Sequence, residues 1–410
     1  MDRQQLRDSE ARFSAYLDGL VSVVGRASRV GPLRDYCTGL LLPCERKSVE
    51  PIAAVTAPGR VGAQHQSLLH FVNQGTWSDD AMLAKVRELV LPEIERHGGI
   101  EAWVIDDTGF PKHGKHSVGV SHQYCGQSGK QDNCQVAVSL SLANRHASLP
   151  VAYRLYLPKS WADDKARRTK AGVPDGISFL TKPKIALDQL AWACAAGLPR
   201  GVVLMDAAYG TDASLRRGAR ELGLAYAAAV HARTLVEACK NDAGTMTAEA
   251  MARALPRRAW QTITWREGTA EPLRSRFARL RVHARGEGCR PDEPEEWLLI
   301  EWPKDADKPT KFWLSTLDRS IAFDRLVDIT MMRWRIERDY LDLKQDVGLG
   351  HFEGRGWVGF HHHATMCIAA YGFLISERGA FPPSQAPSAW HVQAIAIPEN
   401  YRPRGSSAPA

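Results

Sequence analysis

Four acidic residues in this chain stand where a carboxylate can be held rigidly and still reach solvent. Asp106 and Asp107 lie at the end of the hydrophobic run in EAWVIDDTGF, Asp206 follows the run in GVVLMDAAYG, and Glu337 lies among arginines in RWRIER. Carboxylate oxygens held in this way are suitable ligands for a hard divalent cation. One acid from each segment would give three carboxylates. These could hold two Mg²⁺ ions for in-line displacement at phosphate, one activating the attacking oxygen and the other stabilising the leaving oxygen.

Cations accompany these acids. Lys344 comes seven residues after Glu337, which is two helical turns and therefore the same helix face. Such side chains would neutralise a DNA backbone beside the acids. The residues expected to contact DNA are Arg333, Arg335 and Lys344, together with Lys112 and Lys115 in the loop KHGKH.

The elements expected to position the acids are short buried strands. EAWVIDDTGF, CQVAVSLSLAN and LPVAYRLYLP read as a three-stranded antiparallel meander. A helix over 183–197, the strand GVVLMDAAYG, a helix over 211–222 and the strand LAYAAAV follow. Two central strands of a mixed sheet can bring their ends together, so acids far apart in sequence can share one ion.

The flanking segments differ in pattern. Residues 1–98 show helical spacing, with a helix over Asp79–Glu95 that starts after Ser78 and stops near Pro92 or at Gly98 and Gly99. Residues 235–315 are strand-like and hold five tryptophans, and 321–345 read as one charged amphipathic helix before an apolar helix over 358–377. The expected organisation is a helical domain (1–98), the first part of an α/β core (99–234), a β-rich insertion (235–315), the final core helices (316–378) and a loosely structured tail (379–410).

Composition limits the class of protein. The hydrophobic fraction of 44% and the charged fraction of 24% are ordinary for a globular protein, and no run approaches the roughly 20 apolar residues of a membrane span. The polar start lacks a secretory signal, so a cytosolic location is expected. Eight scattered cysteines without a CxxC pair argue against a disulfide framework or a zinc ribbon.

The net charge of +7 suits a polyanionic partner. Part of it is concentrated in one segment, because residues 151–184 hold eight Lys and Arg against three Asp. A basic stretch read alone is more often a solvated face than a binding site. Beside the carboxylates described above, a nucleic-acid contact becomes the better interpretation.

The order of these features resembles the DDE transposases of bacterial insertion sequences, which have a ribonuclease-H-like fold. Arg333, Glu337 and Lys344 match the spacing R-x3-E-x6-K of the branch with a Y-R-E-K signature, and DDTGFPKHGKHSVGV, LPKSWADD and GFHHHA are similar to that branch. The resemblance covers roughly residues 30 to 375. It departs from the signature at Thr330, where the tyrosine would fall.

The resemblance implies a catalytic triad of Asp107, Asp206 and Glu337, because Asp107 directly precedes the threonine. It further implies Mg²⁺ with Mn²⁺ as a substitute, no nucleotide cofactor, and cut-and-paste transfer of element ends into target DNA. A hairpin on the excised end, with an insertion aromatic holding a flipped base, is also implied. A homodimer on double-stranded DNA in the bacterial cytoplasm, associated with the nucleoid, would carry this out, with the N-terminal helices recognising the ends or serving dimerisation.

Other interpretations stay open. The chain could be a nuclease of the same fold that cuts without joining, or a transposase-derived DNA-binding regulator with dispensable catalysis. Asp106 could replace Asp107 as the ligand, Asp206 could simply cap a turn, and Glu337 alone would be a solvated helix residue. The consecutive histidines His361–His363 point about 100° apart on a helix, which favours packing or phosphate contact over one shared ion.

Overall fold

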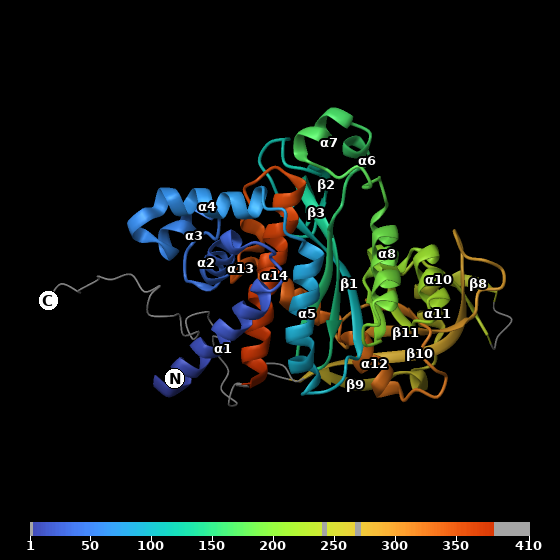
Figure 1. The fold of residues 1–410 in the computed structure, drawn as a ribbon. Helices are drawn as coiled ribbons and strands as arrows, with labels where there is room; N and C mark the ends of the chain where they lie inside the picture. The colour runs from blue at the N-terminus through green and yellow to red at the C-terminus, as the bar shows by residue number, and fades with distance from the viewer. Residues whose placement is uncertain (1–2, 240–243, 267–271, 381–410) are drawn as a thin grey trace.

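The computed structural model describes residues 3–239, 244–266 and 272–380 (Figure 1). The predicted loosely structured tail therefore lies outside the described residues, except for its first two positions. The first five helices pack against one another and against the last helix of the described chain. They are α1 (Arg3–Val21), α2 (Val30–Leu41), α3 (Val49–Thr56), α4 (Val61–Asn73) and α5 (Asp79–Glu95), with short 3-10 turns at Ala27–Arg29 and Pro58–Arg60.

The fifth helix begins where the sequence predicts. Ser78 is its N-cap, and the side-chain oxygen accepts a hydrogen bond from the backbone N–H of Ala81. Pro92 lies inside the helix without ending it. The helix ends at Glu95, just before the Gly98–Gly99 pair.

A mixed sheet forms the centre of the molecule. β1 is antiparallel to β3, and β3 is antiparallel to β4, which confirms the predicted meander. A further strand, β2, pairs with the start of β3 and was not predicted. β5 and β6 then continue the sheet in parallel with β1. Their bounds are β1 (Ala102–Pro111), β2 (Ser121–Cys125), β3 (Lys130–Ala143), β4 (Ser148–Leu155), β5 (Val202–Met205) and β6 (Tyr226–Val230).

Five helices connect these strands, and the longest of them, α8, packs against β3 on one face of the sheet. Residues 183–197 and 211–222 were predicted as helices, and α8 and α10 occupy those places. The helices are α6 (Lys159–Ala162), α7 (Lys165–Ala171), α8 (Lys182–Ala195), α9 (Ala207–Gly210) and α10 (Ala213–Glu221). Together with the parallel strands they give the expected α/β, ribonuclease-H-like architecture.

The β-rich segment after β6 does not form a sheet of its own. Its last strand, β12, pairs antiparallel with β6, so twelve strands of the described chain join in one sheet. Hydrogen bonds therefore run without a break from the acid-bearing strands into the inserted segment. Its elements are β7 (Leu235–Ala238), β8 (Thr245–Thr247), α11 (Ala248–Ala254), a 3-10 turn at Arg257–Ala259, β9 (Gln261–Arg266), β10 (Leu273–Arg285), β11 (Glu295–Trp302) and β12 (Lys311–Ser315).

The single helix predicted over 321–345 is wrong. Two helices occupy this stretch, α12 (Phe323–Met331) and α13 (Trp334–Gln345), with Met332 and Arg333 between them. The charge pattern runs on without Gly or Pro, so the sequence does not show the break. Its effect is to place Arg333 at the start of α13, on the turn before Glu337.

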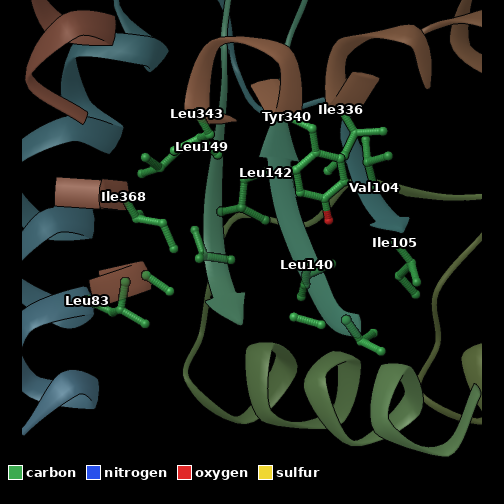
Figure 2. Packing of buried hydrophobic residues seen from close by; sticks show 14 of the residues in the cluster. Leu83, Val104, Ile105, Leu140, Leu142, Leu149, Ile336, Tyr340, Leu343 and Ile368 are labelled. Carbon is green, nitrogen blue, oxygen red and sulfur yellow. The ribbon is translucent and has the colours of Figure 1, made fainter. Parts of the chain in front are cut away.

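The last helix, α14 (Trp357–Ala380), is apolar on nearly every side, as expected of a helix buried all round. It contacts α1, α2, α4 and α5 as well as α13 and β4, so one hydrophobic cluster includes both the N-terminal helices and the sheet. Figure 2 shows part of this core, where Ile336, Tyr340 and Leu343 of α13 point toward the strands. α13 and α14 therefore lie on the sheet face opposite α8.

The histidine run of α14 is buried and contacts three different places. His361 hydrogen-bonds Trp357 O and the backbone N–H of Leu155, whereas His362 faces the carbonyl oxygens of Val72 and Trp77. His363 lies between the Tyr36 hydroxyl and Gly348 O, and burial lowers its pKa to about 4. The three rings join α14 to the surrounding elements rather than pointing at one spot.

Candidate active site

Adjacent acids of β1 point to opposite faces of the sheet, as successive strand residues do. Asp106 is paired in register with Ser139 of β3, whose hydroxyl lies 2.6 Å from the hydroxyl of Tyr340 in α13. Cross-strand partners share a face, so Asp106 faces the glutamate-bearing helix. Asp107 faces the α8 side, where its Oδ2 accepts from Lys182 Nζ at 3.0 Å and from the Tyr209 hydroxyl at 3.1 Å.

Asp206 is the neighbour of Asp106. Parallel pairing of β1 with β5 ends at Ile105 and Met205, so each acid is the next residue after the last pair. Oδ1 of Asp206 accepts from the N–H groups of Ala208 at 2.9 Å and Tyr209 at 3.1 Å, which caps α9. Asp206 therefore caps a helix, as one interpretation expected, and this does not exclude a role in the site. The cap leaves Oδ2 without a hydrogen-bond partner within the part of the chain that the structure describes.

The arginine before α13 joins two of the acids. One guanidinium nitrogen of Arg333 donates to Oδ2 of Asp106 at 2.8 Å, and the other donates to Oε1 of Glu337. A planar fork of donors suits this double contact. Glu337 is 62% exposed and lines the same open pocket as Asp206 and Arg333.

The charges are unevenly balanced at Asp106. Burial, together with the negative charges of Asp206 and Asp107, raises the pKa of this carboxyl to about 7, although the positive charge of Arg333 acts in the opposite direction. The side chain of Asp106 is 16% exposed. Two acids this close, with their repulsion only partly compensated, form a place where added positive charge is favourable.

The donor chemistry fits a hard divalent cation at Asp106 and Asp206. The described residues contain no group of three or more His, Cys, Asp or Glu close enough together to hold a metal ion. Glu337 is engaged by Arg333, although it lines the same pocket. Asp106 and Asp206 therefore lie next to each other, whereas the guanidinium of Arg333 lies between Asp106 and the third carboxylate, Glu337.

The pocket itself has a volume of about 440 Å³ and opens beside α13. Trp265 and Trp313 of the inserted strands line one side, and Thr330 stands where the signature has tyrosine. The Thr330 hydroxyl donates to Leu326 O within α12, so it is engaged in its own helix. Lys311 and His231 also line the pocket.

Of the predicted DNA contacts, Lys115 is exposed, whereas Lys112 is only partly exposed. Lys112 Nζ donates to Phe352 O at 2.6 Å, and burial lowers its pKa to about 8. The ammonium of Lys112 therefore points into the protein in this structure, and a contact with DNA stays a prediction. Lys344 donates to Gly109 O and Gln127, and Arg335 to His146 O, so both hold the site's surroundings in place.

Three residues at the site carried no signal in the sequence. Lys182 and Tyr209 reach Asp107 from elements 75 and 102 residues away, and Trp265 was one of five equivalent tryptophans. Gly210 shows how closely α9 packs, because a Cβ there would overlap Ala229 O of β6. That close approach holds α9, whose N-cap is Asp206, against β6.

The chain is similar to two protein families. The model described as "DDE superfamily endonuclease" matches residues 19–272, and the one described as "Transposase DDE domain" matches 180–373. A curated relative, "Probable transposase for insertion sequence element IS701" from Microchaete diplosiphon, is 28% identical over 201 residues. That match covers 48% of each chain, so the chain spans about half the length of the curated relative it matches. None of the helices in the described part of the chain has the length and apolarity that crossing a bilayer requires.

Proposed function

The chain belongs to the DDE superfamily of endonucleases, and we propose that it is a transposase that cuts insertion-sequence ends and joins them to target DNA. One observation carries the proposal. Asp106 and Asp206 stand side by side at the ends of two parallel strands. Arg333 contacts both Asp106 and Glu337, and it lines one pocket together with Asp206 and Glu337. The three acids come from β1, from the residue after β5 and from α13, so only folding brings them together.

Asp106, Asp206 and Glu337 are the residues that would hold Mg²⁺ or Mn²⁺. Bound there, the cation supplies charge for the attacking and leaving oxygens at phosphate. Arg333 keeps Asp106 and Glu337 within reach of one another, and the α9 N–H groups orient Asp206. Asp107 holds Lys182 from the other face and so positions the rim of the site.

The assignment differs from the triad that the family resemblance implies, which uses Asp107. The register of β1 with β3 and the contact with Arg333 support Asp106 instead. We expect two copies to act on one pair of ends in a cut-and-paste reaction, because both ends must be cut and joined together.

The test is cleavage of labelled element-end DNA with Mg²⁺, followed by joining of the cut 3′ end to a second duplex. Cleavage with joining supports transposition. Cleavage without joining supports a nuclease of the same fold. Binding without cleavage in Mg²⁺ or Mn²⁺ would overturn the proposal in favour of a DNA-binding regulator.

A second part of the proposal concerns the aromatic expected to hold a displaced base. Trp265 is half-buried and lines both the acid pocket and a neighbouring one with Trp334. The other insertion tryptophans are engaged: Trp260 packs edge-on against Trp302, Trp297 lies under Arg279 and Arg281, and Trp313 is buried. We therefore propose Trp265 as the tryptophan that stacks on a base.

Trp265→Ala should slow the step that follows base displacement by about tenfold or more, because base stacking contributes roughly 1–3 kcal/mol. The first nick should be unaffected. Single-turnover gels resolve both steps. Trp265→Phe should recover most of the rate, and a substrate lacking the displaced base should remove the difference between Trp and Ala. An equal loss on the base-less substrate would contradict a stacking role.

A further inference from the structure

Two basic segments meet at the end of β1. We define the basic platform as the loop 112–116 and the helices α6 and α7 with their junction, residues 159–171. These segments hold seven Lys and Arg against two Asp, a surplus of five in a chain whose net charge is +7. Because the Lys112 ammonium points into the protein, the other six of these cations form the basic character of the two stretches.

The platform is rigidly attached. Trp161 of α6 is 2% exposed, and its indole N–H donates to Val120 O at 2.8 Å. The guanidinium of Arg167 lies 3.8 Å from the centre of that indole ring and donates to Lys115 O at 3.1 Å. This one arginine therefore ties α7 to the loop that follows β1. Asp164 caps α7 by accepting from the N–H of Arg167 at 2.9 Å.

The lysines are left for solvent. Lys115, Lys159, Lys165 and Lys170 are all exposed. Among the described residues, lysine ion pairs occur at Lys85, Lys182, Lys184 and Lys311 and at none of these four. Arg167 and Arg168 instead make hydrogen bonds within the protein. Arg167 donates to Lys115 O, and Arg168 donates to Ala162 O and Pro174 O. The platform thus presents four uncompensated ammonium groups on a fixed frame.

Its position is set by the catalytic elements. β1 continues from Asp106 to its last residue, Pro111, and leads directly into the loop 112–116. α7 leads through residues 172–181 to Lys182, whose ammonium lies 3.0 Å from Asp107. Figure 1 shows α6 and α7 projecting above α8 and the strand ends beside β2. A polymer bound at the acids and continuing in this direction would cross the platform.

We propose that the basic platform binds the phosphates of double-stranded DNA that continues past the cleavage site, without reading its sequence. The inference rests on the proposed function. Lysine ammonium groups on flexible stems act as point charges toward phosphate. Single-stranded DNA is instead gripped by exposed aromatics, and the one aromatic of the platform, Trp161, is buried.

The experiment compares Lys159→Gln/Lys165→Gln/Lys170→Gln with a control of equal charge loss, Arg258→Gln/Lys304→Gln/Lys308→Gln, on exposed positions of the insertion. Affinity for end DNA is measured by fluorescence anisotropy over a range of salt. The platform variant should bind about tenfold or more weakly, and the slope of log K against log salt should fall by about two to three. A Lys→Arg triple should bind like the parent.

Three duplexes distinguish the DNA that is bound: one truncated on the element side of the cut, one truncated on the flanking side, and one unrelated target. The substrate without the contacted segment should bind parent and platform variant equally. Equal weakening by the control triple, or an unchanged slope on every duplex, would overturn the platform. The parent protein could fail to cut DNA while its slope of log K against log salt still falls in the platform variant. That result would overturn the proposed function but not the basic platform.

Discussion

Asp106→Asn is expected to lower single-turnover DNA cleavage by about a thousandfold or more, because a charge effect of several kcal/mol on the transition state is at stake. Asp107→Asn should cost no more than about tenfold. Asp106 faces Arg333 and α13, whereas Asp107 faces Lys182 and Tyr209 on the other side of the sheet. Cleavage rates at saturating protein, with binding measured separately, compare the two.

Asp206→Asn is the matched control for a lost carboxylate. An asparagine oxygen can accept the same N–H bonds at the start of α9, so helix capping and the melting temperature should be retained. Cleavage should fall as far as in Asp106→Asn. The reverse pattern, with Asp107→Asn inactive and Asp106→Asn active, would restore the triad that the family resemblance implies.

Arg333→Gln is expected to reduce cleavage by about a hundredfold, and Arg333→Lys should recover little of the loss. One planar group contacts both Asp106 and Glu337, and an ammonium has neither the width nor the fork of donors to do so. About 3 kcal/mol corresponds to this factor. The measurement is the single-turnover rate, together with DNA affinity for each variant.

Arg335→Gln serves as the control, since this neighbouring arginine donates to His146 O and lies over Trp334, whereas Arg333 contacts Asp106 and Glu337. It should retain cleavage far better than Arg333→Gln. If Arg333→Lys cut DNA as fast as the parent, a single positive charge would suffice. The proposal that Arg333 acts by contacting Asp106 and Glu337 at once would then be wrong.

The sequence predicts the parts of the site better than their arrangement. Strand runs that end in acids, the helix that carries Glu337 and the Ser78 cap all follow from local patterns, because strand burial and capping depend on neighbours in sequence. The choice between Asp106 and Asp107 does not. It depends on the register of β1 with β3 and β5, and a shift of one residue exchanges the two faces.

Other features depend on distant parts of the chain. The break between α12 and α13 has no Gly or Pro to announce it, and Lys112 turns inward because Phe352 offers a carbonyl oxygen. The insertion was predicted as β-rich. Its union with the core sheet is set by the pairing of β12 with β6 across a long segment, which no local pattern reports.

The placement of α14 bears on how the protein can be made. The N-terminal helices pack on a helix that is translated more than 250 residues later, and Tyr16 donates to the carbonyl oxygen of Ala369 at 2.8 Å. A nascent chain that stops short of this helix leaves apolar faces of α1, α2 and α5 uncovered. Prematurely terminated products should therefore be cleared or aggregate rather than persist as DNA-binding fragments.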